Sequence, residues 1–164
     1  MSVEVALAVL DREGRWLLQL RDDIAGIVHP GTWGLFGGHL DPGESPAQAV
    51  RRELHEEIAW LAEAALPFWF SDRNAERTAH FFRAPLPVPL EALRLLEGQD
   101  MVLADWQELL SGQVWSPRLG EHRPLAPSLR LARPTFRPLR CCDALGLRLG
   151  LPFAPLLSRG LPAL

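Results

Sequence analysis

Short runs rich in apolar residues, separated by turn-forming residues, recur along the chain, a pattern typical of strands. Strands are expected at residues 3–10, 15–21, 33–40, 66–71, 78–84 and 101–106. The acidic, glycine-containing segment 11–14 is expected to join the first two strands as a hairpin turn. Segment 22–32 is expected to be a loop, because Pro30 and Gly31 interrupt it.

One long helix has unusually complete start signals. Ser45 can cap its N-terminus, Pro46 occupies the first helical position, and Gln48 completes a capping box with Ser45. At about 100° per residue, the apolar positions of this helix form one stripe suited to packing on a sheet. These positions are Ala47, Val50, Leu54 and Ile58. Short helices are also expected near residues 107–112 and 126–132.

Strands on both sides of this helix predict a mixed β-sheet with helices packed against it, an α/β (α+β layered) domain. The 164 residues are enough for one domain with a sizeable core. From residue 133 the periodic pattern gives way to Arg, Pro and Leu, with five prolines in 32 residues. The sequence therefore predicts a folded domain over 1–132 and an extension of undetermined structure over 133–164.

Composition places the chain among ordinary globular proteins, with 48% hydrophobic and 23% charged residues. No apolar run is long enough to cross a bilayer, and Glu4 stands where a signal peptide carries positive charge. The adjacent Cys141 and Cys142 are expected to be free thiols in a reducing compartment. These features predict a cytoplasmic protein that does not bind membranes, and they leave homodimer formation open.

The formal net charge of −3 hides an asymmetry between the two segments. Residues 1–132 hold 12 arginines and 19 acidic residues, a balance of −7, whereas residues 133–164 hold five arginines and one aspartate, a balance of +4. An acidic body is a poor surface for nucleic acid, because phosphate backbones need a basic footprint. If this body binds a polyanion, a cation must lie between them.

Three glutamates crowd one arc of the long helix, beside its apolar stripe. With Glu53 at 0°, Glu56 falls at about 300° and Glu57 at about 40°. Like charges at this spacing repel and slightly destabilise a helix, so folding alone does not explain them. Carboxylates on a rigid element are ligands that Mg²⁺ prefers, and a bound cation would cancel the repulsion. An ordinary solvated acidic face is the alternative, and the residues around the cluster decide between the two.

Those surrounding residues resemble the Nudix box, G-x5-E-x7-R-E-U-x-E-E-x-G-U with U apolar. Gly38 and Glu44 stand at the required spacing before the segment RELHEEIAW, and every fixed position but one agrees. The exception is Ala59, which stands where the family has glycine and has no metal-binding atom. We expect it to affect stability or the exit from the helix rather than the chemistry. The box covers only 23 of the 164 residues, yet so many fixed positions rarely agree by chance.

The resemblance implies a Nudix-type mixed β-sheet sandwiched between helices and a Mg²⁺-dependent pyrophosphohydrolase, with Mn²⁺ able to substitute. Such enzymes cleave a nucleoside diphosphate linked to another moiety, giving a mononucleotide and a phosphorylated product. The implied partner is a small-molecule nucleotide, with the triphosphate and nucleotide-sugar classes both open. The implied metal ligands are Gly38, Glu53, Glu56 and Glu57. Arg52 and Glu44 are implied to orient these carboxylates by a charge-assisted hydrogen bond.

Many Nudix enzymes recruit their general base from a loop far downstream of the box. Glu97 is the first candidate here and Asp100 the second, with Glu53 as the alternative on the helix itself. A solvated loop acid is the ordinary explanation for residues such as Glu97 and Asp100, and the sequence does not choose among the three.

Three further residues are candidate substrate contacts. Arg21, at the end of an expected strand, could contact a substrate phosphate or form a surface ion pair. Trp33 and Phe36, close to the box, could stack on a base, although aromatic residues in strands more often belong to the core.

Two other functions share this resemblance. A Nudix-fold sensor would bind a nucleotide metabolite without cleaving it, but a sensor has no need for a complete acidic cluster. An isoprenoid diphosphate isomerase usually needs a cysteine near the active site, and the cysteines here lie in the C-terminal extension.

Overall fold

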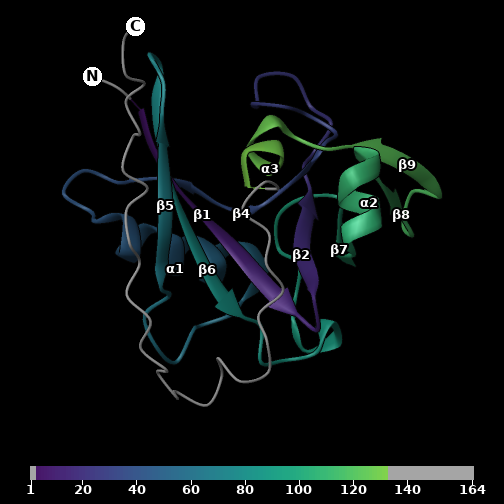
Figure 1. Ribbon diagram of the computed structural model, residues 1–164, viewed down its shortest axis with the longest axis horizontal. Coiled ribbons are helices and arrows are strands. Elements are labelled where there is room, and N and C mark those ends of the chain that lie inside the picture. The colour runs from purple at the N-terminus through teal and green to yellow at the C-terminus, as the bar shows by residue number, and fades with distance from the viewer. Residues whose placement is uncertain (1–2, 133–164) are drawn as a thin grey trace, which may run out of the picture.

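The computed structural model describes residues 3–132, which fold around one mixed β-sheet (Figure 1). The expected extension at 133–164, with Cys141 and Cys142, lies outside the described residues. Along the described chain the elements are β1 (Val3–Arg12), β2 (Arg15–Leu20), β3 (Trp33–Gly34), β4 (Phe36–His39), α1 (Pro46–Ile58), β5 (Phe68–Arg73), β6 (Arg77–Pro85), the 3₁₀ turn η1 (Leu90–Ala92), β7 (Asp100–Ala104), α2 (Trp106–Ser111), β8 (Gln113–Ser116), β9 (Glu121–Pro124) and α3 (Pro127–Ala132).

The sheet has the strand order β3-β2-β1-β6-β5, with β4 also pairing with β1 and β7 with β2. Strands β1 and β6 run parallel, from Val3 opposite Arg77 to Asp11 opposite Pro85. The other pairs in this sheet are antiparallel. The mixed, layered fold expected from the sequence is therefore confirmed.

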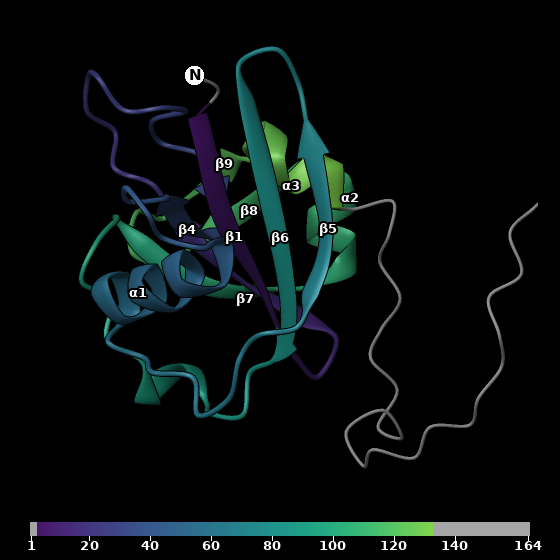
Figure 2. The ribbon, with the colours of Figure 1, turned by 90° about the vertical axis from the view of Figure 1, so that its left-hand side faces the viewer.

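Alternate side chains of β1 enter two separate cores, one on each face of the sheet. Val5 and Val9 belong to the core covered by α2, α3 and the β8–β9 hairpin, whereas Ala6 and Leu10 belong to the core covered by α1. Figure 2 shows the same layers, with α1 on one side of the sheet and α2 and α3 on the other. None of the helices within residues 3–132 has the length and apolar character of a membrane-spanning segment.

The segment 33–40, expected as one strand, forms two. β3 pairs with β2, where Trp33 lies opposite Leu20, and β4 pairs with β1, where Phe36 lies opposite Ala8. At Leu35 the chain stops pairing with β2 and begins to pair with β1. The distribution of apolar residues along the segment does not show such a change of pairing strand. The β8–β9 hairpin was not expected either, because the strand EHRP of β9 has no apolar face.

Helix α1 begins as expected. The Gln48 N–H donates to Ser45 Oγ at 3.4 Å, and the Ser45 N–H donates to Gln48 Oε1 at 2.9 Å, which completes the capping box. The helix ends at Ala59, whose φ of 52° and ψ of 29° are left-handed. This is the conformation that glycine adopts at least cost.

The buried face of α1 differs from the expected stripe. Ala47 is exposed, whereas Ala49 and Glu57 are buried together with the remaining stripe residues. On a helical wheel the buried arc is centred about 50° nearer to the acidic positions than expected. This rotation explains why Glu57 is buried while Glu56 stays exposed.

We expect Ala59→Gly to raise the free energy of unfolding by up to about 1 kcal/mol, because glycine relieves the left-handed backbone. Chemical denaturation of the metal-free protein measures this change. Ala47→Gly is the matched control: at an exposed helical position the same substitution should destabilise the protein by up to about 1 kcal/mol. Destabilisation by both substitutions would contradict the cap assignment.

Candidate active site

Glu57 places a carboxylate inside the protein, with only 3% of the residue exposed. Its Oε2 accepts the Gly37 N–H at 2.7 Å, and its Oε1 accepts the Gln19 side-chain amide at 3.1 Å. Burial raises the pKa of Glu57 to about 8; the Gly37 hydrogen bond opposes the rise, and the charges of Glu53 and Glu97 add to it. Both donors are neutral, so these two hydrogen bonds bring no positive charge to Glu57.

Two glycines of β4 leave room for this arrangement. At Gly37, φ is 126°, and a Cβ would collide with the carbonyl oxygen of Ala6 in β1. At Gly38, a Cβ would collide with the Glu53 carboxylate, which therefore lies against bare backbone. Burial raises the pKa of Glu53, although its hydrogen bond with Arg52 opposes the rise.

Arg52 joins the acids of the box into one network. Its Nε and Nη2 donate to the two carboxylate oxygens of Glu44 at 3.0 and 2.9 Å, a bidentate pair. Its Nη1 donates to Glu53 at 2.9 Å and to Glu56 at 3.0 Å, and its Nη2 also donates to the His39 carbonyl at 2.9 Å. The hydrogen bonds between Arg52 and Glu44 raise the pKa of Arg52 and lower the pKa of Glu44.

Among residues 3–132, no three His, Cys, Asp or Glu side chains already converge as a metal site. Arg52 engages Glu53 and the 56% exposed side chain of Glu56, while Glu57 turns toward strands β2 and β4. The three carboxylates are thus neighbours whose oxygens are directed at protein donors.

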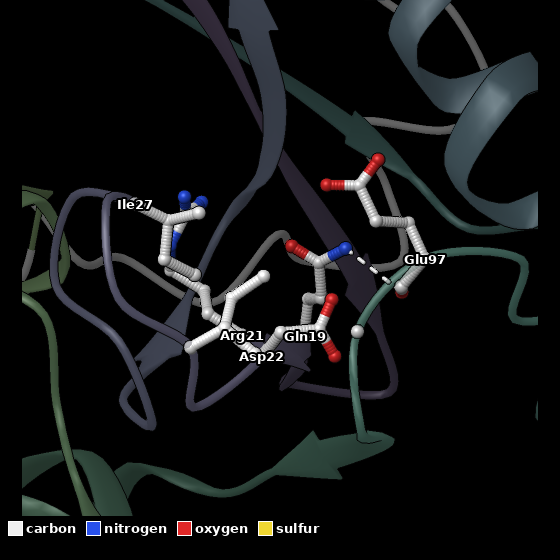
Figure 3. Close-up of a pocket in the computed structure, with 7 residues that line it drawn as sticks. Gln19, Arg21, Asp22, Ile27 and Glu97 are labelled. Carbon is white, nitrogen blue, oxygen red and sulfur yellow. Dashed lines mark hydrogen bonds between the residues drawn. The ribbon is translucent and has the colours of Figure 1, made fainter.

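A cleft of about 890 Å³ opens beside these acids. Glu53 and Glu57 line it together with Arg21 and Glu97, and apolar side chains of β1 form part of its wall. A smaller pocket of about 130 Å³ shares Arg21, Ile27 and Glu97 with the cleft (Figure 3). The larger volume lies in the range of about 300–1,000 Å³ that is usual for small-molecule sites.

Known proteins resemble this chain in sequence and in fold. A family model described as the NUDIX domain matches residues 2–116. The chain belongs to the NUDIX family. It is 37% identical over 76 residues to the nucleoside triphosphatase NudI of Escherichia coli O1:K1, a match that covers 45% of this chain and 53% of that protein. The chain thus spans about half the length of the curated relatives it matches.

Solved NUDIX structures have the same fold. The MutT NUDIX hydrolase from Burkholderia pseudomallei is 21% identical with a TM-score of 0.63, over 84% of this chain and 99% of that one. The NUDIX domain of Shewanella oneidensis NrtR, crystallised with ADP ribose, is 20% identical with a TM-score of 0.61, over 82% and 85%. At these identities the likeness concerns the fold alone.

The two loop acids predicted from the NUDIX resemblance lie in different surroundings. Glu97 lines the cleft from the loop before β7. Asp100 is 4% exposed, and its carboxylate accepts the Ser116 hydroxyl at 2.6 Å and the Arg118 N–H at 3.1 Å. Asp100 therefore anchors the turn after β8, and its prediction as a base is corrected. Arg21 lies just past β2, where it lines both cavities and its Nε donates to the Val28 carbonyl at 2.8 Å.

The predicted substrate contacts Trp33 and Phe36 are also corrected, because both side chains are fully buried. Trp33 belongs to the core beneath α2 and α3, and its Nε1 donates to the Val114 carbonyl at 2.9 Å. Phe36 packs in the core beneath α1. Neither ring is available to stack on a base in the cleft.

Sequence reasoning missed Gln19 and the Gly37 N–H, the two donors that hold Glu57. Gln19 carries a detectable signal, since it is a polar residue inside the otherwise apolar run WLLQL of β2. The role of Gly37 depends on the meeting of β4 with α1, which no local pattern encodes.

We expect the stability of the metal-free protein to fall as pH rises from about 4.5 to about 8, because folded Glu57 retains a proton that its unfolded form releases. One such proton contributes a slope of up to about 1.4 kcal/mol per pH unit. Glu57→Gln should flatten this part of the profile, as measured by chemical denaturation at several pH values. Glu63→Gln, at an exposed position, is the control. An unchanged slope in Glu57→Gln would rule out this carboxyl as its source.

Proposed function

We propose that this NUDIX protein is a Mg²⁺-dependent hydrolase of phosphoric anhydride bonds. Its substrate is a nucleoside diphosphate linked to another moiety, of the nucleoside triphosphate or nucleotide-sugar class. The products are a mononucleotide and a phosphorylated compound. The observation that carries this proposal is that Glu53, Glu57, Glu97 and Arg21 line one cleft. Carboxylates suit a hard cation, and an arginine suits a phosphate.

The relatives support the same chemistry. NudI is a nucleoside triphosphatase, and the Burkholderia pseudomallei MutT protein is a NUDIX hydrolase. The acidic cluster and the cleft lie within the span of the family model except for the C-terminal wall of the cleft, formed by residues 126–128. We therefore derive the reaction class from the family and leave the choice between the two substrate classes to experiment.

The donor set fits a hard divalent cation. The buried Glu57 accepts hydrogen bonds from two neutral donors, so a cation beside it would offset its burial. Gly38 has no side chain between its backbone and the Glu53 carboxylate. We assign as candidate ligands of Mg²⁺, with Mn²⁺ able to substitute, the Gly38 carbonyl and the carboxylates of Glu53, Glu56 and Glu57.

When bound, such a cation supplies neutralisation of the diphosphate charge and a more acidic water. The protein's own side chains hold the metal-binding carboxylates and the substrate phosphate in place. Arg52 keeps Glu53 and Glu56 at one edge of α1, and its bidentate pair with Glu44 keeps the guanidinium in place. Arg21, with its Nε held by a backbone carbonyl, presents its Nη groups to a substrate phosphate.

We assign the general base to Glu97 in preference to Glu53. Glu53 is engaged by Arg52 at 2.9 Å and is a candidate ligand. Glu97 lines the cleft from a separate loop, outside the Arg52 network. A carboxylate within hydrogen-bond reach of the attacking water can accept its proton.

Two other candidates remain testable. The NrtR NUDIX domain was crystallised with ADP ribose, which supports a binding role as the second candidate. A complete acidic cluster favours catalysis over binding alone. An isoprenoid diphosphate isomerase is less well supported, because that activity usually needs a cysteine near the site and residues 3–132 contain none.

A substrate panel separates these functions. The full chain is incubated with Mg²⁺ and, separately, nucleoside triphosphates, nucleotide sugars, ADP ribose and an isoprenoid diphosphate, and the products are resolved by anion-exchange chromatography. Release of a mononucleotide supports the hydrolase, and the substrate turned over with the highest kcat/KM names the class. Tight binding without turnover supports the sensor, and a rearranged isoprenoid diphosphate supports the isomerase.

Hydrolysis should require a divalent metal: EDTA should abolish it, and added Mg²⁺ or Mn²⁺ should restore it. Glu56→Gln withdraws a ligand charge while the buried face of α1 still packs, so it should lower kcat about 10³-fold or more. Steady-state kinetics and thermal unfolding measure both properties. Glu63→Gln, an exposed acid beyond the helix, should retain wild-type turnover. Full activity in chelated, metal-free buffer contradicts the proposal.

Glu97→Gln should lower kcat by about 10²–10⁴-fold with an unchanged thermal midpoint, because it removes a base and no structural contact. Asp100→Asn should show the opposite pattern. It weakens the buried contacts with Ser116 and Arg118 and should cost about 1–3 kcal/mol of stability. If Asp100→Asn is folded and inactive while Glu97→Gln turns over normally, the assignment of the base is reversed.

A further inference from the structure

Gln19 is a buried polar side chain that contacts two parts of the candidate active site at once. With 1% of the residue exposed, its Nε2 donates to Glu57 Oε1 at 3.1 Å and to the backbone carbonyl of Glu97 at 3.0 Å. A primary amide nitrogen carries two hydrogens, so both bonds form together. Figure 3 shows the bond from Gln19 to Glu97 at the wall of the smaller pocket.

The position of Gln19 does not need a polar residue for packing. Leu17, two residues earlier on the same face of β2, lies in the core beneath α1. An apolar residue would fill such a site without the cost of burying an amide, which is offset only by hydrogen bonds. The hydrogen bonds of Gln19 go to Glu57 and to the backbone of Glu97. An apolar residue at this position could not hold these two residues relative to each other.

The loop that carries Glu97 is fixed on both sides. The Leu96 N–H donates to the Glu57 carbonyl at 2.8 Å, and the Gln99 N–H donates to the Leu20 carbonyl at 2.7 Å. Gly98 has φ of 91°, and a Cβ there would lie 2.7 Å from the Leu20 carbonyl oxygen, so the loop passes directly over β2. Gln19 adds a further contact to this loop, through the Glu97 carbonyl, and the same amide nitrogen also donates to the Glu57 carboxylate.

We propose that Gln19 is a positioning residue, which holds the Glu97 loop at a fixed distance from the carboxylates of α1 and fixes the rotamer of Glu57. This inference rests on the proposed function for the role of Glu97, and it extends that function to a residue outside the Nudix box. Gln19 acts through its two partners, because only 1% of the residue is exposed although it lines the smaller pocket.

Gln19→Met tests the proposal, because methionine has nearly the same length and no donor. Residues that orient metal ligands typically change activity or metal affinity by about 10–100-fold when replaced. We expect Gln19→Met to lower kcat in that range while KM changes less than about threefold, since Arg21 and the cleft walls remain. Gln113→Met, the same substitution at an exposed position, should match the wild type.

A double-mutant cycle with Glu97→Gln separates positioning from a general structural effect. If Gln19 acts through Glu97, the loss caused by Gln19→Met should largely disappear in the Glu97→Gln background. Where Glu97→Gln itself lowers kcat, full additivity of the two substitutions overturns the proposal, and so does a kcat of Gln19→Met within twofold of the wild type. If Gln19→Met does not fold, Gln19→Asn keeps an amide too short to reach both partners and should show the same kinetic pattern.

Two readouts need no turnover. Hydrogen exchange at the Leu96 and Gln99 amides should be faster in Gln19→Met than in the wild type, and Mn²⁺ affinity by calorimetry should be about 10–100-fold weaker. Unchanged exchange together with unchanged Mn²⁺ affinity overturns the proposal. An active Glu97→Gln enzyme instead shows that the base of the proposed function is wrong, and these two readouts still decide the role of Gln19.

Discussion

The buried carboxylate of Glu57 is the constraint on which the rest of the site depends. A carboxylate at 3% exposure is tolerated only with hydrogen-bond donors around it. Here the donors come from β4 through the Gly37 N–H and from β2 through Gln19. The helix must therefore rotate its acidic edge toward the sheet, by about 50° relative to an arrangement that buries only apolar residues. That same rotation brings Glu53 to the rim of the cleft.

The crossing at Leu35 supplies the other half of this constraint. Because the chain leaves β2 and joins β1 at that point, Gly37 and Gly38 lie between β1 and α1. Side chains there would collide with the backbone of β1 at Gly37 and with the Glu53 carboxylate at Gly38. Because the two glycines have no side chains, the acidic edge of α1 can lie directly against the backbone of β4. The Gly37 N–H is then free to donate to Glu57.

Local signals predicted the parts of this structure that depend on neighbours in sequence. The capping box of α1 and most of the strands follow from nearby residues, and the box spacing located the acids of the site. Contacts between distant segments could not be predicted this way. The pattern around Trp33 does not say which face its ring enters, and nothing near Asp100 indicates that Ser116 and Arg118 engage its carboxylate. Of the three glutamates, Glu57 stands nearest the apolar stripe on the helical wheel, but its burial depends on contacts with β2 and β4 that the sequence does not show.

Arg52 compensates part of the negative charge of the cluster. Its Nη1 donates to Glu53 and Glu56, which offsets part of their mutual repulsion, while its Nε and Nη2 form an independent bidentate pair with Glu44. A cation that takes over Glu53 and Glu56 would therefore break only the Nη1 bonds and leave the guanidinium paired. Glu57 has no comparable positive partner among its hydrogen bonds, so it gains most from a cation. In the proposed metal site, Arg52 thus compensates Glu53 and Glu56, whereas the buried carboxyl of Glu57 is left for the divalent ion.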